Sequence, residues 1–122
     1  AVLDAAASPG AQVAVLHGTA DGGAASSSGL AAVDPSGRLV VAVRELSQTS
    51  GAQVYEAWLI GADGKPVPAG SFAVGATGVG TMSVAVAGAG SHVVVALTRE
   101  PGPGATAPTL PIVLQGTAGA AG

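Results

Sequence analysis

The sequence predicts an all-β fold, a two-layer antiparallel β-sandwich of about 7–8 short strands that is immunoglobulin-like in architecture. Valine-rich runs of about five residues alternate along the chain with clusters of Gly, Pro, Asp and Ser. The 20 glycines recur at intervals too short for helices, although alanine is abundant. With 122 residues, the chain has the length of one domain.

Four strands are expected in the first half of the chain. Ala11–His17 and Gly29–Asp34 are short apolar runs that end at polar or turn-forming residues. Arg38–Leu46 contains an unbroken run of five apolar residues, and Gln53–Ile60 is rich in β-branched and aromatic residues.

Four more strands are expected in the second half. Val67–Val74 follows the pair Asp63-Gly64, which is a strong hairpin signal. Thr81–Ala87 alternates polar and apolar residues, and His92–Arg99 contains a second run of five apolar residues. Leu110–Gln115 is the last apolar run. Strands spaced by about 10–14 residues are typical of sandwiches and barrels.

The segments between the strands predict turns and loops. Asp34-Pro35-Ser36-Gly37 has the composition of a type I turn followed by a glycine with positive φ. Thr19–Gly29, rich in Gly, Ala and Ser, predicts a mobile loop, and Glu100–Thr109 predicts an extended, proline-stiffened connection. A short helix is expected over Ala1–Ala7, and a frayed tail over Gly116–Gly122.

Side-chain alternation indicates which faces are buried. In Gln53–Ile60, Tyr55 and Leu59 lie on one face and Trp58 lies on the other. Because both faces are partly apolar, this strand is expected to be central, with one face in the core and the other covered near its end. Trp58 and Phe72 are expected to be the two largest packing units of a thin, aliphatic core.

The composition excludes several functional classes. The net charge is −3, and the 4 cationic residues are scattered, whereas binding to nucleic acid needs a basic stripe. The absence of cysteine excludes disulfides, iron–sulfur clusters, thiolate zinc sites and cysteine nucleophiles. No apolar run approaches the ~18 residues of a membrane helix, and the amino end does not resemble a signal peptide.

No catalytic, cofactor-binding or metal site is expected, so the chain is not expected to be an enzyme. The 2 histidines, His17 and His92, fall on separate strands and are interpreted as solvent-facing. No serine lies in a Gly-x-Ser-x-Gly motif. The glycine-rich segment Gly75–Gly80 contains no lysine and precedes a strand, so it is not expected to bind phosphate.

Two glutamates have alternative interpretations. Glu56 is interpreted as a polar strand position beside a core indole, and a sugar-binding platform is the less favoured alternative. Glu100 is interpreted as a strand-end acid that pairs with Arg99 or with a hairpin neighbour, where an exposed pair contributes ~0–1 kcal/mol.

Two segments carry a resemblance to a known family. The first comprises Val54-Tyr55-Glu56-Ala57-Trp58-Leu59-Ile60, Asp63-Gly64 and Pro68-Ala69-Gly70-Ser71-Phe72. The second comprises Val95-Ala96-Leu97-Thr98-Arg99-Glu100-Pro101, Pro108-Thr109 and Ile112-Val113-Leu114. In this order and spacing they resemble the extracytoplasmic C-terminal domain of RskA-type anti-sigma-K factors. The motif residues are Tyr55, Trp58, Leu59, Gly70, Phe72, Thr98, Glu100, Pro101, Pro108 and Thr109.

The resemblance implies a non-catalytic regulatory or sensory domain of a single-pass membrane anti-sigma factor, on the extracytoplasmic face of the cell membrane. In such proteins a cytoplasmic domain, absent from this chain, binds an extracytoplasmic-function sigma factor, and a transmembrane helix, also absent here, provides the anchor. A site-1-type protease begins the regulated intramembrane proteolysis that releases the sigma factor. The Ala, Gly and Val bias is typical of the actinobacteria in which the family is abundant.

The expected division of the chain is a juxtamembrane linker over residues 1–10, the anti-sigma factor ectodomain over 11–116 and a disordered tail over 117–122. The linker and Thr19–Gly29 are expected to open most readily to a protease. An exposed edge strand at Gly29–Asp34 would allow a weak homodimer. The alternative function is a secreted adhesion or carbohydrate-binding β-sandwich module.

Overall fold

The computed structural model describes residues 12–34, 37–61, 64–85, 94–117 and 119–120, and these residues form an all-β fold. The strands are β1 (Gln12–Gly18), β2 (Ser28–Val33), β3 (Arg38–Arg44), β4 (Val54–Ile60), β5 (Pro66–Phe72), β6 (Gly80–Ala85), β7 (Val94–Glu100), β8 (Leu114–Thr117) and β9 (Gly119–Ala120). The predicted fold class is confirmed. The helix expected over Ala1–Ala7 lies outside the described residues.

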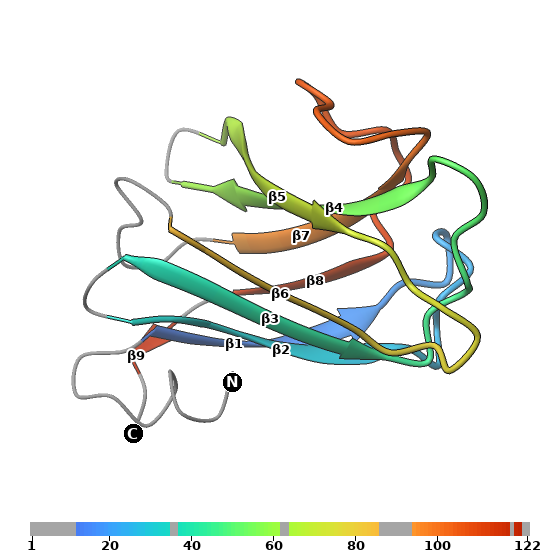
Figure 1. Ribbon diagram of the computed structural model, residues 1–122. Coiled ribbons are helices and arrows are strands. Elements are labelled where there is room, and N and C mark those ends of the chain that lie inside the picture. Colours follow the sequence, from blue (N-terminus) through green and yellow to red (C-terminus); the bar gives the residue numbers. More distant parts are fainter. Residues whose placement is uncertain (1–11, 35–36, 62–63, 86–93, 118, 121–122) are drawn as a thin grey trace.

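All strands belong to one antiparallel sheet, ordered β5-β4-β7-β8-β1-β2-β3-β6, with β9 beside β1. Figure 1 shows β5, β4 and β7 above β1, β2 and β3, with β8 and β6 between these layers. The layers are continuous because His17 and Gly18 of β1 pair with Gln115 and Leu114 of β8. This continuity distinguishes the nearly barrel-shaped sheet from an immunoglobulin sandwich, which has two separate sheets.

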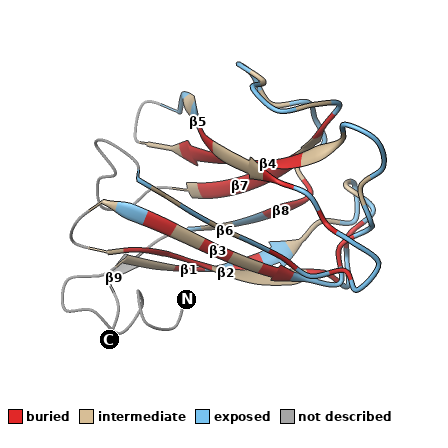
Figure 2. Cartoon of the chain, in the orientation of Figure 1, coloured by how far each residue is buried: buried red, intermediate tan, exposed pale blue. Residues whose placement is uncertain are grey.

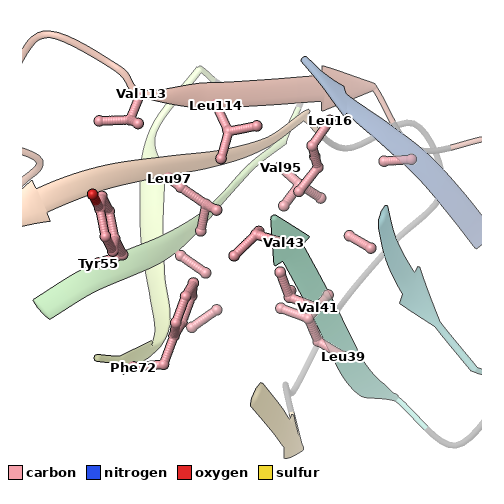
Figure 3. Packing of buried hydrophobic residues seen from close by; sticks show 14 of the residues in the cluster. Leu16, Leu39, Val41, Val43, Tyr55, Phe72, Val95, Leu97, Val113 and Leu114 are labelled. Atoms are coloured by element: carbon pink, nitrogen blue, oxygen red, sulfur yellow. The ribbon is translucent and has the colours of Figure 1, made fainter. Parts of the chain in front are cut away.

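The core fills the space between the layers (Figure 3). In β3, Leu39, Val41 and Val43 point inward and are buried, as strand alternation requires. The rings of Tyr55 and Phe72, from β4 and β5, lie 6.0 Å apart and face these aliphatic side chains. Figure 2 shows the buried positions along the middle of β3, β4 and β7.

Two glycines close the predicted turns. Gly37 has φ 89°, and its N–H donates to the Asp34 carbonyl over 3.0 Å. Gly64 has φ 75°, and its N–H donates to the Gly61 carbonyl over 3.0 Å. Both conformations favour glycine, so the turn residues chosen from the sequence have the expected role. Each turn also contains two residues, 35–36 and 62–63, that lie outside the described residues.

The segment between β1 and β2, where a mobile loop was expected at Thr19–Gly29, is a turn held by hydrogen bonds, and Gly29 already belongs to β2. The Ala24 N–H donates to the Thr19 carbonyl over 2.9 Å, and the Ser27 hydroxyl donates to the Glu45 carbonyl. Ala24 and Ser27 are buried. Small side chains allow this turn to pack tightly, and a composition rich in Gly, Ala and Ser does not distinguish such a turn from a flexible linker.

One other expectation, at the sheet margins, is wrong. β2 pairs with β1 on one side and with β3 on the other, so Gly29–Asp34 is not an edge and provides no route to a homodimer. The edge strands of the described sheet are β5 and β6. Gly116 and Thr117 belong to β8, and Gly119–Ala120 pairs with β1.

Candidate functional site

The motif residues divide between the two faces of the β4–β7 ladder. On the core face lie Tyr55, Leu59 and Phe72, and on the opposite, outer face lie Trp58, Thr98 and Glu100. Trp58 therefore does not belong to the core between the layers, contrary to expectation. The prediction that β4 is central is confirmed, because β4 lies between β5 and β7. Its residues 55–59 are buried on both faces of the strand.

Residues 101–112, which join β7 to β8 and are termed the strap, cover this outer face. Figure 1 shows the strap in orange-red, rising from the end of β7 above that layer. Trp58 is fully buried, with 0% of its surface exposed, and its Nε1–H donates to the Thr98 hydroxyl over 2.8 Å. The Thr98 hydroxyl in turn donates to Glu100 Oε2 over 2.5 Å. A chain of hydrogen bonds thus leads from the indole to a carboxylate.

Glu100 fastens the strap. The N–H of Thr109 donates to Glu100 Oε2 over 2.8 Å, and the Thr109 hydroxyl donates to Oε1 over 2.6 Å. Burial raises the pKa of Glu100, but the hydrogen bonds from Thr109 and Thr98 outweigh burial and hold this pKa below its ordinary value. Glu100 is only 2% exposed. The expected exposed pair with Arg99 is therefore wrong.

Glu56 is a second buried carboxyl group on the same face, also 2% exposed. It pairs with Thr98 across the ladder, so Glu100 is its diagonal neighbour. Burial and the charge of Glu100 raise the pKa of Glu56, and a hydrogen bond from the Ala105 N–H partly offsets them. Among the described residues, Glu56 Oε1 has no hydrogen-bond partner. The sequence analysis placed Glu56 beside the indole but missed its burial against a second acid.

Tyr55 organises the core face of the same strands. Its hydroxyl donates to the Ser47 carbonyl and accepts from Arg99 Nη2, each over 2.7 Å. The Arg99 guanidinium carbon lies 5.3 Å from the centre of the Tyr55 ring. The Arg99 side chain thus makes its contacts on the core face, whereas the side chain of the neighbouring Glu100 makes its contacts on the outer face.

The remaining motif residues have backbone roles. Gly70 has φ 133° beside a register shift at Ala57/Trp58, and a Cβ there would lie 3.5 Å from the sulfur of Met82. Gly70 therefore lies where the two edge strands approach each other. Pro101 and Pro108 lie in the strap, where their rings limit the conformations of the chain.

A hollow of about 430 Å³ lies elsewhere, on the lower layer, and Val15, Leu30, Ala42 and Arg44 are among its lining residues. None of the motif residues lines it. The candidate site is therefore the polar cluster beneath the strap, not this hollow.

Residues 1–112 match the family model described as the C-terminal part of the anti-sigma-K factor RskA. The chain belongs to this RskA family. The match includes all the motif residues and ends at the last residue of the strap. No curated protein and no solved structure significantly matches the chain. As an RskA-family domain, the chain is part of an anti-sigma factor, a regulator whose partner is a sigma factor.

The described part of this RskA-family domain contains no group of three or more His, Cys, Asp or Glu side chains placed to hold a metal ion. Nor do the described residues include a helix with the length and apolar character needed to cross a bilayer. His17 is exposed in β1, and His92 lies outside the described residues.

The closed strap limits what the RskA-family cluster can bind. Because Trp58 is fully buried, its ring is not available to stack on a sugar while the strap is in place. This geometry disfavours the carbohydrate-binding alternative. What the cluster does offer is two neighbouring carboxyl groups in one buried site, of which one is stabilised as a carboxylate and the other is not.

Proposed function

We propose that this domain is the non-catalytic, extracytoplasmic regulatory domain of a single-pass membrane anti-sigma factor. In this proposal its folded state restrains the site-1-type protease that begins release of an extracytoplasmic-function sigma factor. Residues 1–10 are the juxtamembrane linker and residues 11–116 the regulatory domain. Family membership supports the anti-sigma role, and the position of β1 is the observation that carries the proposed restraint.

β1 begins immediately after the proposed linker and lies inside the sheet. It pairs with β2 from Gln12 to His17, and with β8 and β9 on its other side. A protease binds its substrate as an extended, unpaired segment on both sides of the cut, so cleavage just before Gln12 requires the start of β1 to leave both of these ladders. The cleavage rate then follows the free energy of opening. Thr19–Gly29, the other segment expected to open readily, is held by hydrogen bonds, which makes it the less favoured place for the first cut.

The test uses the full-length membrane protein and the protease that makes the first cut. Leu97→Ala removes a side chain that is 0% exposed, and we expect it to lower the free energy of unfolding by about 2–5 kcal/mol. Val79→Ala, at a side chain that is 53% exposed, is the matched control. We expect faster cleavage of Leu97→Ala and a wild-type rate for Val79→Ala, with the first cut before Gln12. Equal rates in all three proteins, or a first cut inside the folded strands, would contradict the proposal.

A further inference from the structure

The strap lies against two acids of the sheet. Glu100 fastens it by accepting hydrogen bonds from the N–H and the hydroxyl of Thr109, and the backbone of Ala105 lies close enough to Glu56 to affect its pKa. The strap itself, residues 101–112, contains no titratable side chain. Any pH dependence of its attachment therefore originates in the sheet beneath it.

No described cation compensates the two acids. Arg99 is engaged with Tyr55 on the opposite face of the ladder. Lys65 precedes β5 at the far end of the β4–β5 hairpin, where Ile60 pairs with Pro66, whereas Glu56 pairs with Ser71. Glu45 is exposed beside Gly78. β5, β8 and the strap bring no titratable group to the pair.

Two carboxylates buried together without a cation repel each other, so one of them retains a proton or moves into water. Of the two acids, Glu100 ionises more readily, because three hydrogen bonds stabilise its negative charge. Glu56 has an oxygen without a partner and is therefore the group that holds the proton. The other side of the ladder is the core, so an ionised Glu56 reaches water only on the side where the strap lies.

We propose that the strap is a proton-operated latch, closed over Trp58 while Glu56 is protonated and loosened when Glu56 ionises beside Glu100. Loosening exposes an indole and a threonine hydroxyl that the closed strap hides. The domain thus has one surface that depends on pH. This inference rests on the cluster alone and does not depend on the proposed control of proteolysis.

The pKa directions define the pH window in which the closed state is favoured. The pKa of Glu56 is raised, so its contribution to the closed state is complete below its ordinary value of 4.5 and is lost as the pH rises through the raised pKa. The pKa of Glu100 is lowered, so its contribution is present above 4.5 and is lost as the pH falls through the lowered pKa. The strap is most firmly closed between these two pKa values.

Trp58 is the only tryptophan, so its fluorescence reports on the strap. We expect acrylamide quenching of the wild-type chain to rise about twofold or more as the pH is raised from 4.5 through the raised pKa of Glu56. Glu56→Gln has nearly the same shape and does not ionise, so its quenching should stay low throughout this range. Glu45→Gln, at an exposed acid, is the matched control and should follow the wild-type profile. Far-ultraviolet circular dichroism should show an unchanged sheet in all three proteins.

Three outcomes would overturn the latch: a flat wild-type profile, the same profile in Glu56→Gln, or closure restored at about pH 8 by calcium ions, which would indicate a cation site. If Glu56→Gln does not fold, carboxyl carbon chemical shifts of the wild-type chain provide the test. We expect Glu56 to titrate above 4.5, the ordinary value for a glutamate, and titration of Glu56 at or below that value would refute the proposal.

Discussion

The Thr98 hydroxyl joins the side chains of the cluster beneath the strap. It accepts from Trp58 Nε1 and donates to Glu100, so a single oxygen satisfies an indole N–H and a carboxylate. Valine has nearly the same shape as threonine but neither donates nor accepts. In a site where Trp58 is 0% exposed, both partners would lose a hydrogen bond that water cannot readily replace.

Thr98→Val should therefore lower the free energy of unfolding by about 1–3 kcal/mol, because it leaves a buried donor without an acceptor. Thr81→Val, at an exposed position of β6, is the control and should change it by less than about 0.5 kcal/mol. Urea denaturation of the three proteins measures both effects. A Thr98→Val protein as stable as the wild type would show that the hydroxyl has no structural role.

At the scale of elements, β5 and β6 approach each other without joining the sheet into a closed barrel. They are the two ends of the described strand order, yet Gly70 of β5 lies against Met82 and Val84 of β6. The register shift between β4 and β5 lies beside Gly70, and such irregularities bend a strand, here the edge strand β5, toward β6. This seam depends on side-chain packing and on a backbone conformation that only glycine adopts readily.

Gly70→Ala should lower the free energy of unfolding by about 1 kcal/mol or more, because φ 133° is strained for any residue with a Cβ. The control is Gly75→Ala, where an added Cβ would meet nothing within 4 Å and should be nearly neutral. Thermal unfolding of both variants separates the two cases. Equal melting temperatures for Gly70→Ala and Gly75→Ala would refute the structural role of this glycine.

At the scale of the whole molecule, the acid pair makes stability depend on pH. Glu56→Gln should unfold with a higher free energy than the wild type at about pH 8, because the wild-type chain then has two buried carboxylates. Near pH 4 the two proteins should be equally stable, since Glu56 is protonated there. Denaturant unfolding at the two pH values measures the difference. A constant difference across the range would mean that ionisation of Glu56 is not its cause.

Most strands were predictable because their signals are local, although the last one begins at Leu114 and not at Leu110. Valine alternation in β3 and the glycines that end the turns lie within a few residues of the structure that they determine. The position of Trp58 was not predictable in the same way. Alternation places Trp58 opposite Tyr55 in the strand but does not tell which face meets the other layer when both faces are covered.

The candidate site depends on contacts between distant parts of the chain. Trp58 and Thr98 are 40 residues apart in the sequence, and Glu56 and Glu100 meet only because β4 pairs with β7. The family resemblance identified most residues of the cluster as motif residues, but it did not predict which of them contact one another. It missed the burial of Glu56, since a glutamate in a strand is usually exposed.

Gln12, the first described residue, and the strap lie at opposite ends of β1. Gln12 begins β1 at the linker end, whereas Gly18 pairs with Leu114, where the strap enters β8. The seven residues of β1, at ~3.3 Å each, separate these ends by about 20 Å. Any influence of the strap on Gln12 that passes through β1 must therefore cross this distance, as a change in how tightly the ladders of β1 hold together. The two ends of the strand would then communicate through cooperativity.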